Sequence, residues 1–340
     1  MKKTLLTLLT IFLVTILAAC SSGNANSDDT LTMVWYPNES GNDLKAARDE
    51  IGQVIEEVTG KKVEHKLTTD YAIAIETIAN GNAQLAFMGA QGYIEAKNKN
   101  SKIEPLIVPS GASGTVDDAV YYSWLAVKKA NAENYKTNGE FSIDQIVDSK
   151  FSFVSNSSTS GFKVPSTDIV SYFSKEDKWK DLTSEDLMEG GTFFKEVLYG
   201  DSHQGSAVNL LSDRADVAAF CDTCVGNYVE VAEGEANTKG SVYRVKADAT
   251  EPFNTVLGEE FTLINVTPVL NAPFAANMDN LSEEDFKKIQ TILTSDDISN
   301  NENIFVPKDS EMAGLFTKTA DEKFIVVDDA WFDPIRELTK

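Results

Sequence analysis

Residues 154–165 read Val-Ser-Asn-Ser-Ser-Thr-Ser-Gly-Phe-Lys-Val-Pro, and the rest of the chain can be interpreted around them. The preceding residues, Phe151-Ser152-Phe153-Val154, are typical of the end of a buried strand, and apolar residues recur at helical spacing from Ile169 to Phe173. A strand, a hydroxyl-rich turn and a helix therefore follow one another. The first N–H groups of such a helix lack backbone partners and lie at the positive end of its dipole, so we expect an oxyanion site here.

A second interpretation of the same turn is structural. Serine is one of the commonest N-cap residues, so the cluster could do no more than begin the helix. For a serine cluster alone the cap is the better interpretation, and the rest of the chain is what favours a ligand site.

The N-terminus has the features of a secretory signal. Met1-Lys2-Lys3 is a short basic region, and the apolar run from Leu5 to Ile16 is too short for a comfortable membrane span. Its end, Leu17-Ala18-Ala19-Cys20, resembles the lipobox of bacterial lipoproteins, which implies a signal peptide at residues 1–19 and a diacylglycerol on Cys20. The alternative is an ordinary cleavage site that contains a cysteine. Residues 20–29 are polar and predict a flexible tether.

The charge of the chain excludes one class of partner. The formal net charge is −23, and loss of residues 1–19, with Lys2 and Lys3, leaves −25. Phosphate backbones are bound by clustered Lys and Arg, so we expect no nucleic acid partner. A small anion can still bind, provided that local amides and hydroxyls outweigh the repulsive field of the whole molecule.

The cysteines other than Cys20 form one pair, Cys221 and Cys224. Outside the cytoplasm such a pair is a disulfide, a redox motif or half of a metal site. The only histidines are His65 and His203, so a zinc site has too few ligands, and we expect neither a metal nor a cofactor. A structural or labile disulfide is the preferred interpretation.

Strand and helix patterns alternate along the rest of the chain, as in right-handed parallel crossovers. They predict two α/β lobes joined by two crossing segments, with lobe 1 at residues 30–115 and 255–340 and lobe 2 at residues 116–254. Helices are expected at 142–147, 206–211 and 225–232, and strands at 121–127, 193–199 and 215–220, among others. Ligands bind at the carboxyl ends of α/β strands, so we expect a ligand cleft between the lobes with the serine turn at its edge.

Several motifs resemble those of one family. The string Ser158-Thr159-Ser160-Gly161-Phe162 with Val164-Pro165 resembles the anion-binding loop of the phosphate/phosphite/phosphonate-binding (PhnD-like) proteins, the extracytoplasmic receptors of ABC importers. Other landmarks follow in the family's order: Asp70-Tyr71-Ala72, Gly89 with Tyr93-Ile94-Glu95-Ala96, Ser202-His203, and Ala215-Asp216-Val217-Ala218-Ala219. The resemblance runs from Trp35 to the region of Leu293. It implies a type II periplasmic-binding-protein fold and a partnership with an ABC permease and ATPase.

The resemblance also implies roles for single residues. The hydroxyls and amides of Ser158, Thr159 and Ser160 would surround the phosphorus oxyanion. His203 would donate to the same group, and we expect it to titrate near the pH outside the cell. The tyrosines at Tyr71 and Tyr121 would complete the pocket.

Departures from the family pattern bear on the substrate. Receptors for aminoalkyl phosphonates use two carboxylates for the ammonium group, and the corresponding places here hold Thr223 and a position at or beside Ala272. Asp222 is one place out of register, and we include it among the expected ligand contacts. These differences predict phosphite, a simple alkylphosphonate or a phosphate ester. The Cys221 and Cys224 pair would lie near the same rim, so its redox state is expected to alter the pocket.

Other functions compete with the receptor. A protein of the same fold could bind sulfonates or thiamine precursors, or it could act as a sensor for a membrane kinase. A thiol oxidoreductase using Cys221 and Cys224, or a hydrolase using a serine with His203, is disfavoured, since the chain has no Gly-x-Ser-x-Gly elbow. We therefore expect a monomeric, lipid-anchored binding protein on the extracytoplasmic face of the membrane, and not an enzyme.

Overall fold

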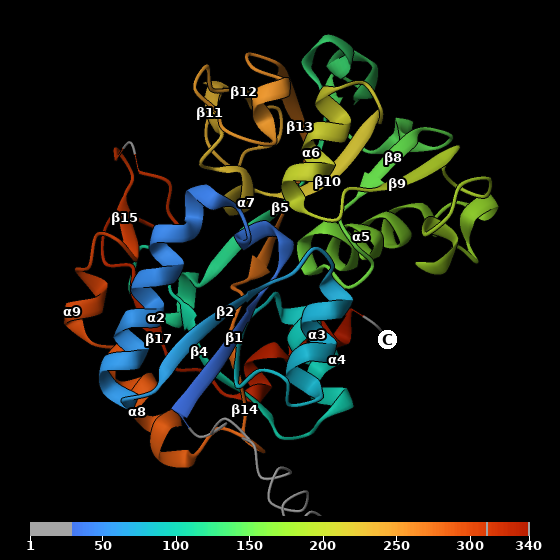
Figure 1. Cartoon of the computed structure of the whole chain (residues 1–340). Helices are drawn as coiled ribbons and strands as arrows, with labels where there is room; N and C mark the ends of the chain where they lie inside the picture. Colours follow the sequence, from blue (N-terminus) through green and yellow to red (C-terminus); the bar gives the residue numbers. More distant parts are fainter. Residues whose placement is uncertain (1–28, 311, 339–340) are drawn as a thin grey trace, which may run out of the picture.

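The computed structural model describes residues 29–310 and 312–338. The predicted signal peptide, Cys20 and nearly all of the tether lie outside these residues. The described chain forms two lobes, each built on its own β-sheet (Figure 1). Among the described residues, no helix combines the length and the apolar character that a membrane span requires.

Lobe 1 is the body built on a six-stranded sheet. The strand order is β17-β4-β14-β3-β1-β2. Strands β2 and β3 run parallel to β1, with Trp35 opposite both Leu67 and Phe87, whereas β14 runs antiparallel to β3 and β4. The strands are β1 (Thr30–Trp35), β2 (Lys62–Leu67), β3 (Leu85–Phe87), β4 (Ile103–Pro109), β14 (Phe274–Asn277) and β17 (Phe324–Ile325).

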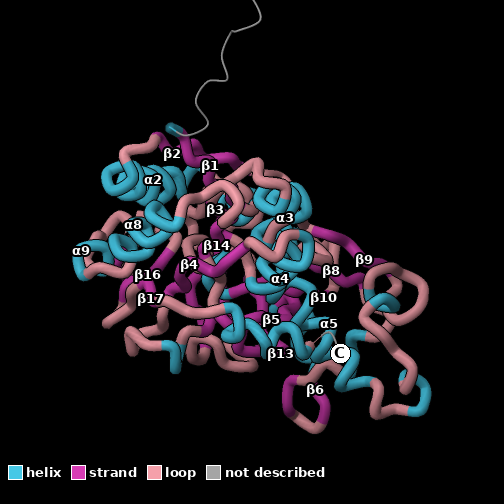
Figure 2. Tube along the Cα trace, turned by 90° about the horizontal axis from the view of Figure 1, so that it is seen from below, coloured by secondary structure: helices cyan, strands magenta, loops and turns pink. Residues whose placement is uncertain are grey.

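Helices cover both faces of this sheet. Helix α2 packs with α8 on one side, and α3 packs with α4 on the other (Figures 1 and 2). Helix α3 begins at Tyr71, because the Asp70 carboxylate caps it by accepting hydrogen bonds from the N–H groups of Ala72 and Ile73. The helices of lobe 1 are α2 (Lys45–Thr59), α3 (Tyr71–Ala79), α4 (Ala90–Lys99), α8 (Glu283–Leu293), α9 (Asp296–Ser299) and α10 (Asp333–Glu337).

Lobe 2 is built on a seven-stranded sheet of order β11-β12-β13-β5-β10-β8-β9. Strand β8 is parallel to β9 and β10, and the remaining pairs are antiparallel. The strands are β5 (Val120–Lys128), β8 (Lys150–Phe153), β9 (Glu196–Tyr199), β10 (Val217–Cys221), β11 (Val229–Glu233), β12 (Val242–Val245) and β13 (Glu260–Leu270). The helices are α5 (Val164–Phe173), α6 (His203–Leu211) and α7 (Asp222–Val225).

Strands β5 and β13 carry the chain between the lobes. They pair antiparallel along their whole length, from Phe261 opposite Lys128 to Leu270 opposite Val120. Both crossings therefore form one two-stranded ribbon, which places the two sheets side by side.

The remaining elements are short. Two small sheets pair β6 (Lys136–Thr137) with β7 (Glu140–Phe141) and β15 (Phe305–Pro307) with β16 (Phe316–Lys318). The 3-10 segments are η2 (Pro37–Glu39), η3 (Asn42–Leu44), η4 (Val116–Asp118), η5 (Lys129–Tyr135), η6 (Asp144–Ile146), η8 (Asp177–Trp179), η9 (Glu185–Leu187), η10 (Phe253–Thr255) and η11 (Asp329–Phe332).

The structure corrects three predicted elements. The helix expected at 225–232 is wrong, because α7 ends at Val225 and Val229–Glu233 pairs with β12 as a sheet strand. The strand expected from Phe193 begins only at Glu196, and the rings of Phe193 and Phe194 pack in the core of lobe 2. The helix expected at 142–147 is a single 3-10 turn.

Buried side chains connect the two lobes. One apolar cluster contains Tyr36 and Tyr71 from lobe 1 together with Val154 and Cys221 from lobe 2. The lobes are therefore in contact around the ends of β1, β8 and β10, where the predicted site residues lie.

Candidate functional site

The serine turn is buried and begins an irregular helix. Ser158 is the N-cap of a π-helical turn, η7 (Thr159–Lys163), which continues as α5, and its Oγ accepts a hydrogen bond from Gly161 N at 3.1 Å. The side chains of Ser158, Thr159 and Ser160 are only 1%, 2% and 1% exposed. The cap interpretation is thus correct for Ser158, but capping alone does not require two further hydroxyl groups inside the protein, and π-turns are frequent at functional sites.

Gly161 allows this turn to fold back on its own strand. A Cβ at Gly161 would lie 2.3 Å from Cγ2 of Val154, closer than any two such atoms can approach. The Gly161 carbonyl also accepts a hydrogen bond from Val154 N at 3.1 Å. The glycine therefore fixes the turn against the end of β8.

The other two hydroxyls of the turn differ in their partners. Thr159 Oγ1 accepts a hydrogen bond at 2.9 Å from the backbone N–H of Gln91, in the first turn of α4 in lobe 1. Ser160 Oγ is buried and has no hydrogen-bond partner, although its carbonyl accepts one from Ser123 Oγ at 2.7 Å. The Ser160 hydroxyl is therefore available to a ligand.

His203 presents an N–H group to the turn. It is the first residue of α6, whose N-cap is Ser202, and its Nδ1 accepts a hydrogen bond from Cys221 N at 3.0 Å. Because a backbone N–H can only donate, the proton of the neutral ring sits on Nε2, which lies 3.4 Å from Ser158 Oγ. Burial lowers the pKa of His203 to about 3. The expectation that His203 titrates near external pH is therefore wrong, and the residue is a neutral donor.

Two tyrosines approach the turn from other elements. Tyr71, at the start of α3, lies close enough to Ser158 for that hydroxyl to affect its pKa, and it receives a hydrogen bond from Asn38 Nδ2 at 2.7 Å. Tyr121, on β5, lies close enough to Ser160 and Thr159 for their hydroxyls to affect its pKa. Burial raises the pKa of both tyrosines, so their hydroxyls remain protonated. The structure thus brings six of the seven predicted ligand contacts together.

Asp222 is the seventh, and its carboxylate is held by the protein. Its Oδ1 accepts a hydrogen bond from Tyr122 N at 2.8 Å, and its Oδ2 accepts one from Asn237 Nδ2 at 3.1 Å. Burial raises the pKa of Asp222 to about 6. Nearby, Thr223 is exposed, and Ala272 packs against an apolar cluster of lobe 1. A contact between Asp222 and the ligand stays a prediction.

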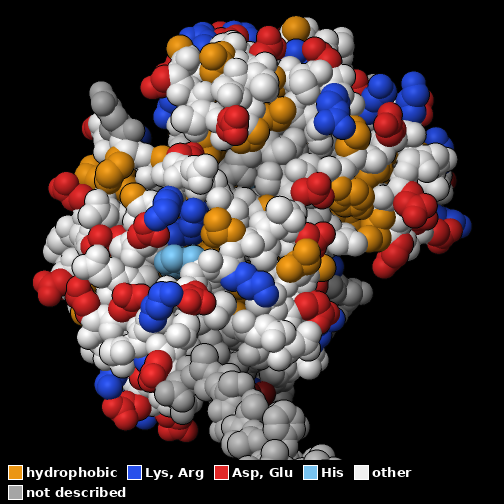
Figure 3. Space-filling view, in the orientation of Figure 1, with side chains coloured by type: hydrophobic (Ala, Val, Ile, Leu, Met, Phe, Trp, Pro, Cys, Tyr) orange, Lys and Arg blue, Asp and Glu red, His pale blue; other side chains and the backbone are white. Residues whose placement is uncertain are grey.

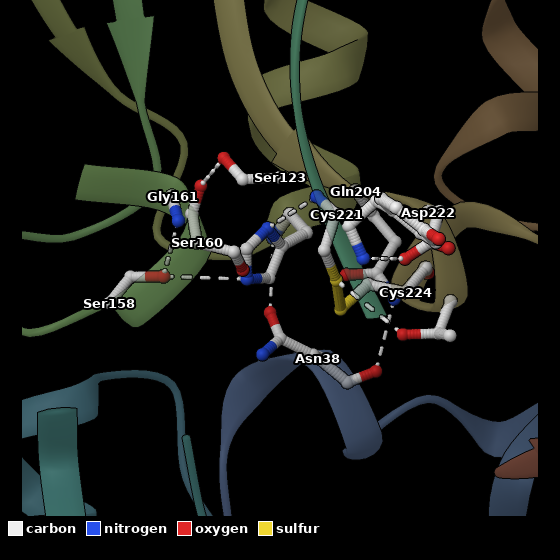
Figure 4. The surroundings of a disulfide bond; sticks show 12 residues. Asn38, Ser123, Ser158, Ser160, Gly161, Gln204, Cys221, Asp222 and Cys224 are labelled. Atoms are coloured by element: carbon white, nitrogen blue, oxygen red, sulfur yellow. Dashed lines mark hydrogen bonds between the residues drawn. A yellow bond between two sulfur atoms is a disulfide. The ribbon is translucent and has the colours of Figure 1, made fainter. Parts of the chain in front are cut away.

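Cys221 and Cys224 are joined by a disulfide, with their Cα atoms 5.4 Å apart (Figure 4). Each cysteine also holds a neighbour of the turn through its backbone, because Cys221 N donates to His203 and Cys224 O accepts from Gln204 Nε2 at 3.0 Å. The Sγ atoms and a ring nitrogen of His203 lie within 4.8 Å of one another. With the sulfurs bonded to each other, neither is a thiolate that could bind a metal.

Sequence reasoning missed Asn38, which connects the lobes. Its Oδ1 accepts a hydrogen bond from His203 N at 3.0 Å, and its carbonyl accepts one from Gln204 Nε2 at 3.0 Å (Figure 4). The sequence showed Pro37-Asn38-Glu39 only as the end of a strand. The available signal was its place, since it directly follows the carboxyl end of a parallel strand, where α/β proteins bind ligands.

Further hydrogen bonds join the lobes around the site. Ser157 Oγ donates to Glu95 Oε2 at 2.9 Å, and Tyr228 Oη donates to Asp43 Oδ2 at 2.7 Å. On the outer surface, Figure 3 shows acidic and basic side chains intermingled on the visible face, without a uniform basic area. Ser158, Thr159, Ser160 and His203 supply uncharged donors from lobe 2, and Tyr71 supplies one from lobe 1, a set suited to a small anion.

Comparison with known proteins identifies the family. The sequence profile of the periplasmic substrate-binding proteins of phosphonate ABC transporters matches residues 33–332. The chain is 27% identical over 263 residues to the phosphate-import protein PhnD of Mycolicibacterium smegmatis, an alignment that covers 76% of the chain and 75% of that relative.

Solved structures show the same fold. A binding component of an ABC phosphonate transporter from Pseudomonas aeruginosa superimposes with a TM-score of 0.62 and 19% identity, over 92% of this chain and 86% of that one. PhnD1 from Prochlorococcus marinus, in complex with methylphosphonate, gives a TM-score of 0.62 and 16% identity, over 92% and 97%. These matches confirm the predicted two-lobe α/β fold of the type II periplasmic binding proteins. The chain belongs to the family of periplasmic substrate-binding proteins of phosphonate ABC transporters, and it is a binding protein rather than an enzyme.

Proposed function

We propose that this protein is an extracytoplasmic, lipid-anchored receptor that closes its lobes on a phosphorus oxyanion and delivers it to an ABC importer. The observation that carries the proposal is the buried serine turn, on which the hydroxyls of Ser158, Thr159 and Ser160, the Nε2–H of His203 and the hydroxyls of Tyr71 and Tyr121 converge. These groups come from both lobes, so a ligand at the turn would be enclosed.

Neutral donors suit an oxyanion in an acidic protein. A hydrogen bond to a charged group contributes roughly 1.5 to 3 kcal/mol, so a few of them provide substantial affinity. The Gly161 N–H in the first turn of η7 donates to Ser158 Oγ, and the other N–H groups of that turn lack intrahelical acceptors and add to this set. The ligand's charge is thereby solvated without a cationic side chain among these donors.

The proposed ligand is a phosphonate, phosphite or phosphate ester that carries no ammonium group. A relative named for phosphate import and a structural neighbour that holds methylphosphonate support this class. The exposed position of Thr223 and the protein-bound carboxylate of Asp222 argue against a dedicated ammonium site at that rim.

The remaining proposals concern the membrane and the partners. We propose that Cys20 carries the lipid, that the receptor is a monomer and that its partners are a permease and an ATPase. Mass spectrometry of the N-terminal peptide from membranes tests the anchor. An unmodified Cys20, or an N-terminus at another residue, would contradict it.

Calorimetric titration tests the ligand class. The soluble form, starting after Cys20, is titrated with phosphite, methylphosphonate, aminoethylphosphonate, phosphate and sulfate. We expect tight binding of a phosphorus oxyanion, with aminoethylphosphonate no tighter than methylphosphonate. Preference for sulfate would redirect the proposal to sulfonates, and no binding at all would refute it. An uptake measurement with the reconstituted permease and ATPase distinguishes a receptor that delivers its ligand to an importer from one that acts as a sensor.

A further inference from the structure

Glu39 is a buried acid at the junction of the lobes with no role in the site described above. It ends the turn η2 that follows β1, and the residue is 9% exposed. Its backbone carbonyl accepts a hydrogen bond from Arg48 Nη1, but its carboxyl atom Oε2 is buried and has no hydrogen-bond partner. A buried carboxyl oxygen without a partner is costly, so it calls for an explanation.

The neighbours of Glu39 are residues of the ligand site. Burial is the main cause of the raised pKa of Tyr71, Tyr36 and Tyr121, and the charge of Glu39 adds to the shift of all three. Tyr36 and Tyr71 lie ring against ring, with centroids 4.1 Å apart. The adjacent residue, Asn38, bonds both Tyr71 and the backbone of His203.

Unpartnered atoms gather at the same place. In the part of the chain that the structure describes, five buried side-chain oxygens lack a hydrogen-bond partner. Four of them belong to Tyr36, Glu39, Ser160 and Gln204, and the fifth belongs to Thr262 in β13. Buried polar atoms are normally satisfied, so their concentration on residues of the site and next to it is what a missing polar ligand would explain.

We propose that the Glu39 carboxyl group is a ligand contact, and that it holds one proton in a hydrogen bond to an oxygen of the bound phosphorus oxyanion. The inference rests on the proposed function and specifies its chemistry. The proton comes from solvent when the ligand binds to the ionised acid, and no covalent bond forms or breaks. Binding of the ligand to the receptor is thus coupled to the uptake of one proton.

The electrostatics of the site agree with this role. Burial raises the pKa of Glu39 to about 8, an effect that the Asn38 side chain and Arg48 only partly oppose. A bound dianion would raise it further, because like charges disfavour ionisation. The other ionisable groups of the site are His203, Asp222, Glu95, Lys163 and the three tyrosines. His203 is neutral well below neutral pH, burial raises the pKa of Asp222 to about 6, and the tyrosines remain protonated.

Calorimetry in buffers of different ionisation enthalpy measures this proton directly. At pH 9, where methylphosphonate is already a dianion, we expect wild-type protein to take up about one proton per ligand bound, and the Glu39→Gln variant to take up none. Above pH 8 the wild-type affinity should fall about tenfold per pH unit, while that of the variant stays nearly level. Glu322→Gln is the matched control, since Glu322 is also buried but bonds Thr319 and Ala320 far from the turn.

The outcomes separate the two proposals. Wild-type protein that binds methylphosphonate with the same proton uptake as Glu39→Gln, or with none, overturns the role of Glu39 and leaves the proposed function intact. A loss in the variant confined to aminoethylphosphonate also overturns it, because the carboxylate would then pair with the ammonium group. Wild-type protein that binds no phosphorus oxyanion refutes both.

Discussion

The side-chain oxygen of Asn38 accepts a hydrogen bond from the backbone N–H of His203 at 3.0 Å, across the junction of the two lobes. The same side chain donates to Tyr71 Oη. Asn38→Ala removes both bonds and leaves a buried N–H unpartnered, so we expect ligand binding to weaken by about 1 to 3 kcal/mol. Calorimetry measures the loss. Asn303→Ala, an exposed amide that bonds Glu50, is the control and should bind like the wild type.

Substitutions in the serine turn distinguish a role in ligand binding from a role in helix capping. Ser158→Ala with Thr159→Ala removes two hydroxyls from the proposed site, and we expect binding to become undetectable while the fold persists. Loss of a cap alone costs about 1 to 2 kcal/mol of the free energy of unfolding. Ser295→Ala is the matched control, because Ser295 caps α9 away from the site. Equal ligand affinity in both variants would leave the turn with only a structural role.

His203 gives the protein a pH-dependent stability. The folded state keeps this imidazole neutral until the pH approaches about 3, whereas the unfolded chain takes up the proton near pH 6.5. Its contribution is fully present above pH 6.5 and is lost as the pH falls towards 3, at up to about 1.4 kcal/mol per pH unit. Denaturant unfolding of wild type and His203→Gln from pH 7 to pH 4 should show the difference between them shrinking. A constant difference would contradict a buried neutral His203.

The disulfide positions two neighbours of the turn through its backbone. In Cys221→Ser with Cys224→Ser we expect weaker ligand binding, because the N–H that orients His203 and the carbonyl that holds Gln204 become less fixed. The free energy of unfolding should fall by only about 2 kcal/mol, since the closed loop is short. Titration of wild type with and without a reductant gives the same comparison without mutation. Equal affinity in all of these proteins would exclude a redox effect on the pocket.

The backbone of Gly161 lies so close to the Val154 side chain that no Cβ fits between them. Gly161→Ala would bring a Cβ to 2.3 Å from Val154, so we expect a loss of about 1 to 3 kcal/mol in the free energy of unfolding, together with weaker binding. Gly226→Ala is the control, because its nearest atom would lie at an ordinary 3.4 Å. Thermal unfolding of both variants is the measurement. A Gly161→Ala protein as stable as the control would mean that the turn can shift freely.

Local signals in the sequence predicted much of the fold. The strand before the serine turn and the helix expected at 206–211 depend on residues within a few positions, and the structure confirms both of them as β8 and α6. The helix expected at 225–232 failed for a tertiary reason. Val229 and Val231 suit a strand as well as a helix, and pairing with β12 decides the outcome.

The sequence predicted only those residues of the site that belong to a motif of neighbouring residues. The serine turn and His203 stood out as residue patterns, whereas Asn38 and Glu39 had no pattern of their own. Asn38 meets His203 from 165 positions away, and no sequence periodicity reports such a contact. The state of His203 also depended on the fold, because burial and the N–H of Cys221 determine its charge and tautomer.

The pairing of the two crossings restricts how the chain can change in length. Strands β5 and β13 are in register from Val120 to Lys128, with one irregularity between Leu263 and Asn265. A single residue inserted in β5 before Trp124 would move every following side chain to the opposite face of the ribbon, and Trp124 would then exchange places with Leu125. Insertions and deletions should therefore be confined to the outer loops, while the connection between the lobes keeps a fixed number of residues.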